Sequence, residues 1–122
     1  MTTVSPGLSS ELLTVDTVSL DGAVRIVCAG EVDCSTAPAL RRALDGAFAD
    51  GPLGVTVDLE AVTFLDSAGL SALAVAHRTA DQAGVPLRVL VATRAVTRAL
   101  QVTGLWDLLR AEHVQPGSAG AA

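Results

Sequence analysis

The chain has 122 residues, 50% of them hydrophobic, and a formal net charge of -5. This length suits one compact core and is too short for two ordinary domains. The hydrophobic residues come in short runs broken by Gly, Asp, Arg or Pro, so none approaches the ~20 apolar residues of a membrane-spanning helix. These totals predict a single soluble domain without membrane insertion.

The basic residues and the first residues of the chain argue against two further classes of protein. All eight basic residues are Arg, scattered singly except for the pair Arg41-Arg42, so no basic stripe could follow a phosphate backbone. Residues 1–10 lack the basic start and apolar block of a secretory signal. We therefore expect a cytoplasmic protein that does not bind nucleic acid directly.

The cysteines and histidines are too few and too dispersed to predict a metal site. Cys28 and Cys34 cannot form a disulfide framework or a zinc cage, and His77 and His113 add no short paired spacing. We expect both cysteines to be small packing residues. A Gly-rich phosphate-binding loop between a strand and a helix is also absent from the sequence, so we predict no cofactor.

The two ends differ in composition from the middle of the chain. Residues 1–10 and 112–122 are rich in Ser, Gly, Ala and Pro and have no periodicity. Such composition is typical of loosely ordered termini. We predict flexible tails over residues 1–10 and 112–122, and one domain over residues 11–111.

The domain is predicted to open with a β-hairpin followed by a helix. Residues 12–20 and 23–29 are β-prone, and Asp21-Gly22 between them readily takes the positive φ angles of a tight turn. The helix follows Ser35-Thr36, either of which is suited to cap it, and ends before Gly51-Pro52. Its apolar face consists of Leu40, Ala43, Leu44, Ala47 and Phe48.

Strands and helices are predicted to alternate through the rest of the domain. Residues 54–59 are a β-branched run typical of a central strand, and residues 87–91 form the next strand. Between them, a helix over residues 67–83 stops at Gly84. A third helix follows Thr93 and ends near Gly104, after which Trp106 is expected at the core edge. This order predicts a mixed sheet packed with helices.

The helix over residues 67–83 is expected to carry one apolar face. That face consists of Leu70, Leu73, Ala74 and His77. At the start of this helix, an apolar segment changes abruptly to Asp66-Ser67-Ala68-Gly69-Leu70. Asp66 and Ser67 are suited to cap the helix, which is their ordinary structural role. Because Ala68 and Gly69 add little bulk, we also expect the backbone beside Ser67 to be open to a closely approaching partner.

Three separated segments resemble the STAS domains of bacterial anti-sigma factor antagonists. The first is residues 59–70, which end in Asp66-Ser67-Ala68-Gly69-Leu70. The second is Gly30-Glu31-Val32-Asp33 followed by Ser35-Thr36-Ala37, and the third is Thr103-Gly104-Leu105. The three occur in order and cover about residues 12–109. The resemblance implies an α/β STAS fold with a mixed sheet of about four to five strands and three to four helices.

The resemblance also implies a function and a site. It implies that the protein binds an anti-sigma factor that is also a serine kinase, that a sigma factor is thereby released, and that phosphorylation of Ser67 inactivates the protein. ATP would belong to the partner, and a phosphatase would reverse the modification. Many members of the family carry a second Ser or Thr directly after the phosphorylated Ser, where this chain has Ala68. The implied partner-binding residues are Asp33, Ser35, Thr36, Asp66, Ser67, Ala68, Gly69 and Leu70.

Two other functions are weighed against this prediction. A hydrolase built from Ser67, His77 and Asp66 or Asp81 is disfavoured, because ten residues on one helix separate Ser67 from His77 by about 15 Å and no Gly-x-Ser-x-Gly elbow is present. We therefore expect no enzyme. STAS-like domains also serve as accessory subunits of lipid-transport or stress-signalling complexes, and this is the alternative function. Asp33 and Ser67 favour the antagonist.

Overall fold

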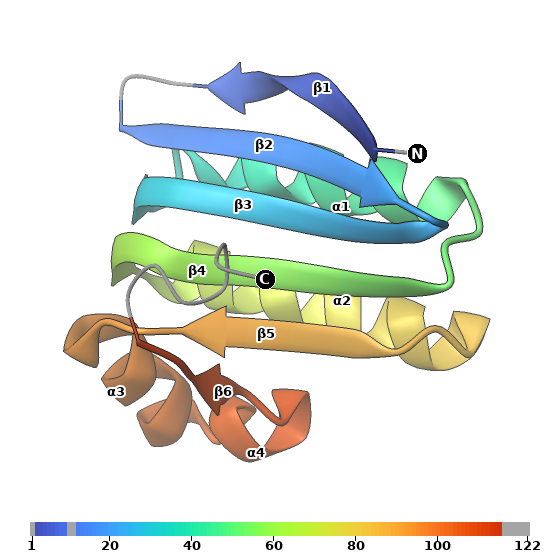
Figure 1. The fold of residues 1–122 in the computed structure, drawn as a ribbon. Helices are drawn as coiled ribbons and strands as arrows, with labels where there is room; N and C mark the ends of the chain where they lie inside the picture. Colours follow the sequence, from blue (N-terminus) through green and yellow to red (C-terminus); the bar gives the residue numbers. More distant parts are fainter. Residues whose placement is uncertain (1, 10–11, 116–122) are drawn as a thin grey trace.

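A mixed β-sheet forms the centre of the protein, as seen in a computed structural model that describes residues 2–9 and 12–115. In this part of the chain the sheet has six strands, arranged side by side in chain order (Figure 1). The first three pair antiparallel, and the remaining pairs are parallel. The strands are β1 (Thr2–Ser9), β2 (Leu13–Leu20), β3 (Ala23–Val32), β4 (Gly54–Leu65), β5 (Leu87–Val91) and β6 (Glu112–His113).

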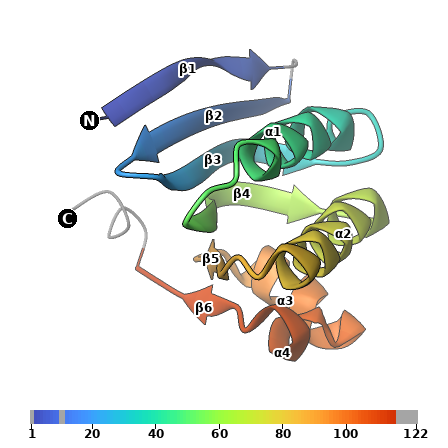
Figure 2. The same ribbon diagram turned by 90° about the vertical axis from the view of Figure 1, so that its right-hand side faces the viewer.

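Four helices occur in the described part of the chain and accompany the parallel strands. The two longest, α1 and α2, lie side by side against the same face of the sheet (Figure 2). Because α1 follows β3 and α2 follows β4, both helices begin at the edge where these strands end. The predicted mixed sheet packed with helices is confirmed. The helices are α1 (Ala37–Ala49), α2 (Ser67–Ala83), α3 (Arg94–Thr103) and α4 (Leu105–Leu109).

The hydrophobic core lies between the helices and the sheet. Alternate residues of β3, β4 and β5 point toward the helices, because successive side chains of a strand face opposite ways. Those from the sheet include the fully buried Ile26, Val57 and Val89. They pack with buried leucines from α1, α2 and α3, and the half-buried Trp106 packs at the edge of the core as predicted. This packing of the helices on the sheet fixes the positions at which α1 and α2 begin.

Local residue choices explain the hairpin and the helix ends. Asp21 and Gly22 have φ angles of 52° and 86°, so the predicted tight turn between β2 and β3 is present. Gly84, at a φ angle of 68°, ends α2 where the sequence predicts. Thr93 stands at the N-cap position of α3, but its hydroxyl donates a hydrogen bond of 2.8 Å to the carbonyl oxygen of Val62. That bond ties the start of α3 to β4.

The two ends of the chain differ from the predicted tails. Thr2–Ser9 pairs with β2 as an edge strand, and its register shifts between Ser5 and Leu8, where Pro6 and Gly7 lie. An irregular edge strand is the place in a sheet that tolerates proline. At the other end, Glu112–His113 pairs with β5. Residues 1, 10 and 116–122 of the predicted tails lie outside the described residues.

An ion pair supports the short strand β6. The Arg88 side chain of β5 donates two hydrogen bonds of 2.9 Å to the Glu112 carboxylate. These bonds raise the pKa of Arg88 and lower the pKa of Glu112. The arrangement joins two residues 24 positions apart, which explains why the local composition around Glu112 did not predict a strand. None of the helices in the described residues is long and apolar enough to cross a membrane.

The buried face of α2 is rotated relative to the prediction. We expected Leu70, Leu73, Ala74 and His77 to share the apolar face, but only Leu73 of these is fully buried, and the other three are half-buried. Small residues take the most buried positions because α2 packs closely on the sheet and on α1. The buried residues of α2 are Gly69, Ala72, Leu73, Ala76 and Ala80.

Candidate functional site

Two polar segments leave the sheet side by side at the edge where β3 and β4 end. Val32 and Leu65 are paired residues at the ends of these strands. The backbone N–H of Asp66 donates a hydrogen bond of 3.1 Å to the carbonyl oxygen of Val32. Asp33 and Asp66 therefore begin neighbouring connections, from β3 to α1 and from β4 to α2. The structure thus brings together the two segments that the sequence singled out.

Asp66 caps α2 and thereby sets the position of Ser67. Its backbone is extended, and its carboxylate accepts hydrogen bonds from the N–H groups of Ala68 and Gly69 at 2.9 and 3.4 Å. The N-capping role expected of Asp66 and Ser67 is therefore filled by Asp66. Ser67 is the first residue of the helix and is exposed. Within the described residues its hydroxyl has no hydrogen-bond partner, so it is accessible to another molecule.

The Asp33 carboxylate organises the neighbouring turn. Its Oδ1 atom accepts hydrogen bonds from the Ser35 hydroxyl at 2.7 Å, from the Ser35 N–H at 2.9 Å and from the Thr36 N–H at 3.1 Å. The Ser35 hydroxyl bond, and then the backbone bonds, hold the pKa of Asp33 below its ordinary value despite an opposing desolvation effect. Because the folded state favours the carboxylate, this contribution to stability is present above the unfolded-state pKa and is lost as pH falls through the lower, folded-state pKa.

Thr36 supports the turn from the inside. Its side chain is buried, and its hydroxyl donates a hydrogen bond of 2.9 Å to the carbonyl oxygen of Glu31. The same hydroxyl accepts a hydrogen bond of 2.8 Å from the N–H of Asp33. Thr36 occupies the N-cap position of α1, but its side chain makes no capping bond to that helix. Its observed contacts therefore hold the turn, and its side chain lies in the interior and not on the surface.

Gly69 also faces the interior, which corrects the expectation of an open backbone beside Ser67. A Cβ atom at this position would collide with the side chains of Leu65 and Val32. Gly69 therefore lets α2 begin close against the ends of β3 and β4 without displacing the side chains of Leu65 and Val32. The accessible part of this segment is Ser67, with the half-buried side chains of Asp66, Ala68 and Leu70 beside it.

Three residues near this edge were not predicted as site residues from the sequence. Phe64, paired with Glu31 near the ends of β4 and β3, is 46% exposed. Arg41 of α1 donates a hydrogen bond of 3.3 Å to the hydroxyl of Ser71 in α2. Phe64 had a detectable signal in the sequence: Phe64 and Leu65 are adjacent apolar residues at a strand end, and successive side chains of a strand point to opposite faces. Arg41 and Ser71 are each the fifth residue of a helix that follows a parallel strand, so aligning the two units would have found the pair.

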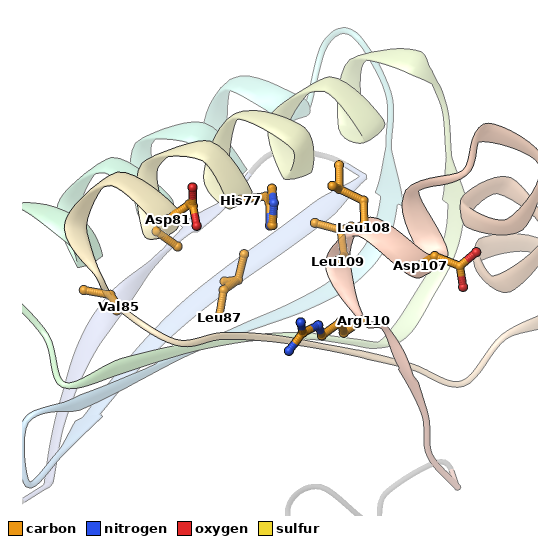
Figure 3. A pocket seen from close by; sticks show the side chains of 9 residues that line it. His77, Asp81, Val85, Leu87, Asp107, Leu108, Leu109 and Arg110 are labelled. Atoms are coloured by element: carbon orange, nitrogen blue, oxygen red, sulfur yellow. The ribbon is translucent and has the colours of Figure 1, made fainter.

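One cavity among the described residues lies away from Ser67. It has a volume of about 470 Å³ and lies between the C-terminal half of α2, the start of β5 and α4 (Figure 3). His77 and Asp81 line it together with Arg110. His77 is ten residues after Ser67 on the same helix, a rise of about 15 Å, so the two side chains form no catalytic pair.

The two cysteines have different environments. Cys28 is buried in β3, as predicted, but Cys34 is exposed in the Asp33 turn and is not a packing residue. The turn places Cys34 directly after Asp33, outside the core, while Thr36 fills the buried position. Burial, followed by the negative charges of the nearby Asp58 and Asp16, raises the pKa of the Cys28 thiol to about 12.

This difference predicts selective labelling of Cys34. A thiol-reactive dye such as dithionitrobenzoate at about pH 8 should modify Cys34 in the folded protein, because thiolates are the reactive species and Cys28 is both buried and protonated. Both thiols should react after denaturation. Peptide mapping by mass spectrometry identifies the labelled residue, and Cys34→Ser should remove native-state labelling. Equal labelling rates of the two cysteines in the folded protein would contradict the structure.

A family model and several known proteins are similar to this chain. A sequence model of the STAS domain matches residues 14–121. The chain is 30% identical over 106 residues to an anti-sigma-B factor antagonist of Staphylococcus aureus, covering 87% of this chain and 95% of that protein. It is 37% identical over 87 residues to the anti-sigma-F factor antagonist RsfB of Mycobacterium tuberculosis, covering 70% of this chain and 69% of that protein.

A solved structure agrees with these sequence relatives. The crystal structure of an anti-sigma factor antagonist from Mycobacterium paratuberculosis matches with a TM-score of 0.78 and 31% sequence identity, covering 93% of this chain and 95% of that one. The fold and the sequence relationships therefore agree. The chain belongs to the STAS domain family, among its anti-sigma factor antagonists.

Proposed function

We propose that this protein binds an anti-sigma factor through the edge formed by the Asp33 turn and the start of α2, and that this binding releases a sigma factor. The observation that carries the proposal is the exposed Ser67 hydroxyl at the first position of α2, beside the Asp33 turn. Phe64 and Leu70 supply apolar contact area at the same edge. Asp33, Ser35, Asp66 and Ala68 complete the accessible contact surface, while Thr36 and Gly69 support it from below.

In this proposal, the anti-sigma factor phosphorylates Ser67, and this modification controls the binding between the two proteins. ATP is held by that partner, and the Ser67 Oγ attacks its γ-phosphorus. A bond forms between Oγ and phosphorus, the bond to the β–γ bridging oxygen breaks, ADP leaves, and the hydroxyl proton passes to a base on the partner. A phosphatase later adds water to the phosphoester, releasing inorganic phosphate and restoring the hydroxyl.

The position of Ser67 suits this chemistry. An acceptor hydroxyl has to reach the γ-phosphorus in line with the leaving oxygen, and Ser67 is exposed at the helix start. The positive end of the helix dipole at the N-terminus of α2 favours a negative group placed there, so the modified protein is expected to stay folded. Ala68 in the next position leaves Ser67 as the hydroxyl of this motif.

Site mapping by mass spectrometry tests the proposed modification. Incubating the protein with its cognate anti-sigma factor and ATP is expected to add a single phosphate, at Ser67. Ser67→Ala should abolish incorporation, and Ser71→Ala, which removes an exposed hydroxyl one turn further along α2, should leave it intact. Phosphate on another residue, or undiminished incorporation in Ser67→Ala, would reject the site.

A further inference from the structure

Arg41 and Ser71 form a bridge between two helices next to the proposed modification site. Arg41 Nη2 lies 3.3 Å from Ser71 Oγ, and α1 and α2 are neighbours on one face of the sheet (Figure 2). Ser71 is four residues after Ser67, and residues with this spacing share a helix face with about 6 Å between their Cβ atoms. The Arg41 guanidinium is therefore about one helical turn from Ser67.

The contacts of Arg41 leave its guanidinium available for a stronger acceptor. In the part of the chain that the structure describes, ion pairs involve Arg25 and Arg88, whereas Arg41 bonds to the neutral Ser71 hydroxyl. That bond is longer than most N–H···O hydrogen bonds, and the side chain is exposed. Asp45 lines the same groove as Arg41, but it lies one turn further from the Ser67 edge.

We propose that Arg41 is the internal counterion of phosphorylated Ser67 and moves from the Ser71 hydroxyl to the phosphate when the phosphate is added. This inference rests on the proposed modification of Ser67. A planar guanidinium forms paired, charge-assisted hydrogen bonds with phosphate, which are stronger than a bond to a neutral hydroxyl. Side chains of a helix tilt toward its N-terminus, so Arg41 is directed toward the edge where Ser67 lies.

The negative charges around Ser67 explain why a phosphate there would be stabilised by pairing with Arg41. Asp66 directly precedes Ser67 and Asp33 begins the neighbouring turn, so a phosphate here is placed among carboxylates. A guanidinium from α1 offsets this repulsion within the protein. The paired phosphate is then held against α1 and α2, which stabilises the modified state and shields the phosphoester from phosphatases.

The test measures the second pKa of the phosphate by phosphorus-31 NMR. Phosphoserine is inserted at position 67 during translation, so the experiment does not depend on a kinase. This pKa is ordinarily about 6, and a nearby cation favours the dianion and lowers it. Arg41→Ala is expected to raise the pKa by about half a pH unit, a roughly threefold change in the acid constant. Arg42→Ala is the matched control, because it removes the same charge from the next exposed residue of α1.

The outcomes separate this inference from the proposed function. A pKa shift in Arg41→Ala that is absent from Arg42→Ala supports the pairing, and Arg41→Lys should keep part of the effect. Equal shifts in the two alanine variants, or no shift in either, overturn it. If the phosphorylated protein still binds the anti-sigma factor tightly, the proposed function fails while the pairing of Arg41 with the phosphate remains measurable.

Discussion

Replacing Ser67 with aspartate is expected to weaken anti-sigma factor binding about 30-fold. A carboxylate at this position lies about 6 Å from that of Asp66, where two unit charges repel by roughly 0.7 kcal/mol in water and roughly 3 kcal/mol at an effective dielectric constant of about 20. In the free protein the repulsion between the two carboxylates is close to its value in water. In a contact that excludes water it approaches the value at the lower dielectric constant. The difference, about 2 kcal/mol, destabilises the complex with the anti-sigma factor and does not destabilise the folded protein.

Two control variants isolate this effect. Ser67→Ala should bind within about twofold of the unmodified protein, because the Ser67 hydroxyl has no partner within the described residues that would be left unsatisfied. Gln82→Glu adds one negative charge to an exposed position at the other end of α2 and should also bind normally. Isothermal titration calorimetry with the cognate anti-sigma factor measures all three. Equal affinities of Ser67→Ala and Ser67→Asp would reject the charge mechanism.

Gly30→Ala is expected to lower the free energy of unfolding by about 3 kcal/mol or more. Gly30 has a φ angle of 119°, which side chains rarely adopt, and a Cβ atom there would collide with the carbonyl oxygen of Leu12. That oxygen accepts the hydrogen bond of 2.9 Å from the N–H of Glu31 at the end of β3. The substitution therefore strains the strand that leads directly into the Asp33 turn.

A second glycine provides the matched control. Gly46 lies inside α1, is exposed, and has nothing within 4 Å of an added Cβ atom. Gly46→Ala should raise the free energy of unfolding by about 0.5 to 1 kcal/mol, because alanine is the better helix former. Urea denaturation followed by circular dichroism compares the two variants. Similar small effects from both would show that the backbone at Gly30 is not constrained as the structure describes.

The sequence predicted those elements whose signals are local. Asp21-Gly22 specifies its own turn, and α2 runs from Ser67 to Ala83 as expected, because Asp66 caps it and Gly84 stops it. The same local logic placed Asp66 and Ser67 at a helix start. Both predictions depend on residues a few positions apart, where backbone preferences act directly.

The elements that the sequence did not predict depend on distant partners. Thr2–Ser9 becomes a strand by pairing with β2, and Glu112 is joined to Arg88 across 24 positions. Gly69 was expected to leave the backbone open to a partner, but it is buried because Leu65 and Val32 occupy the space beside it. The bridge from Arg41 to Ser71 likewise exists only once α1 packs beside α2. Tertiary packing, which single-residue patterns do not encode, decides each of these features.

The affinity of the anti-sigma factor for the unmodified protein and for the protein phosphorylated at Ser67 is the most direct test of the proposed switch. A phosphate carries up to two negative charges and is larger than a carboxylate, so we predict a loss of affinity of at least about a hundredfold, with circular dichroism spectra that remain alike. Unchanged affinity after complete phosphorylation of Ser67 would contradict the account.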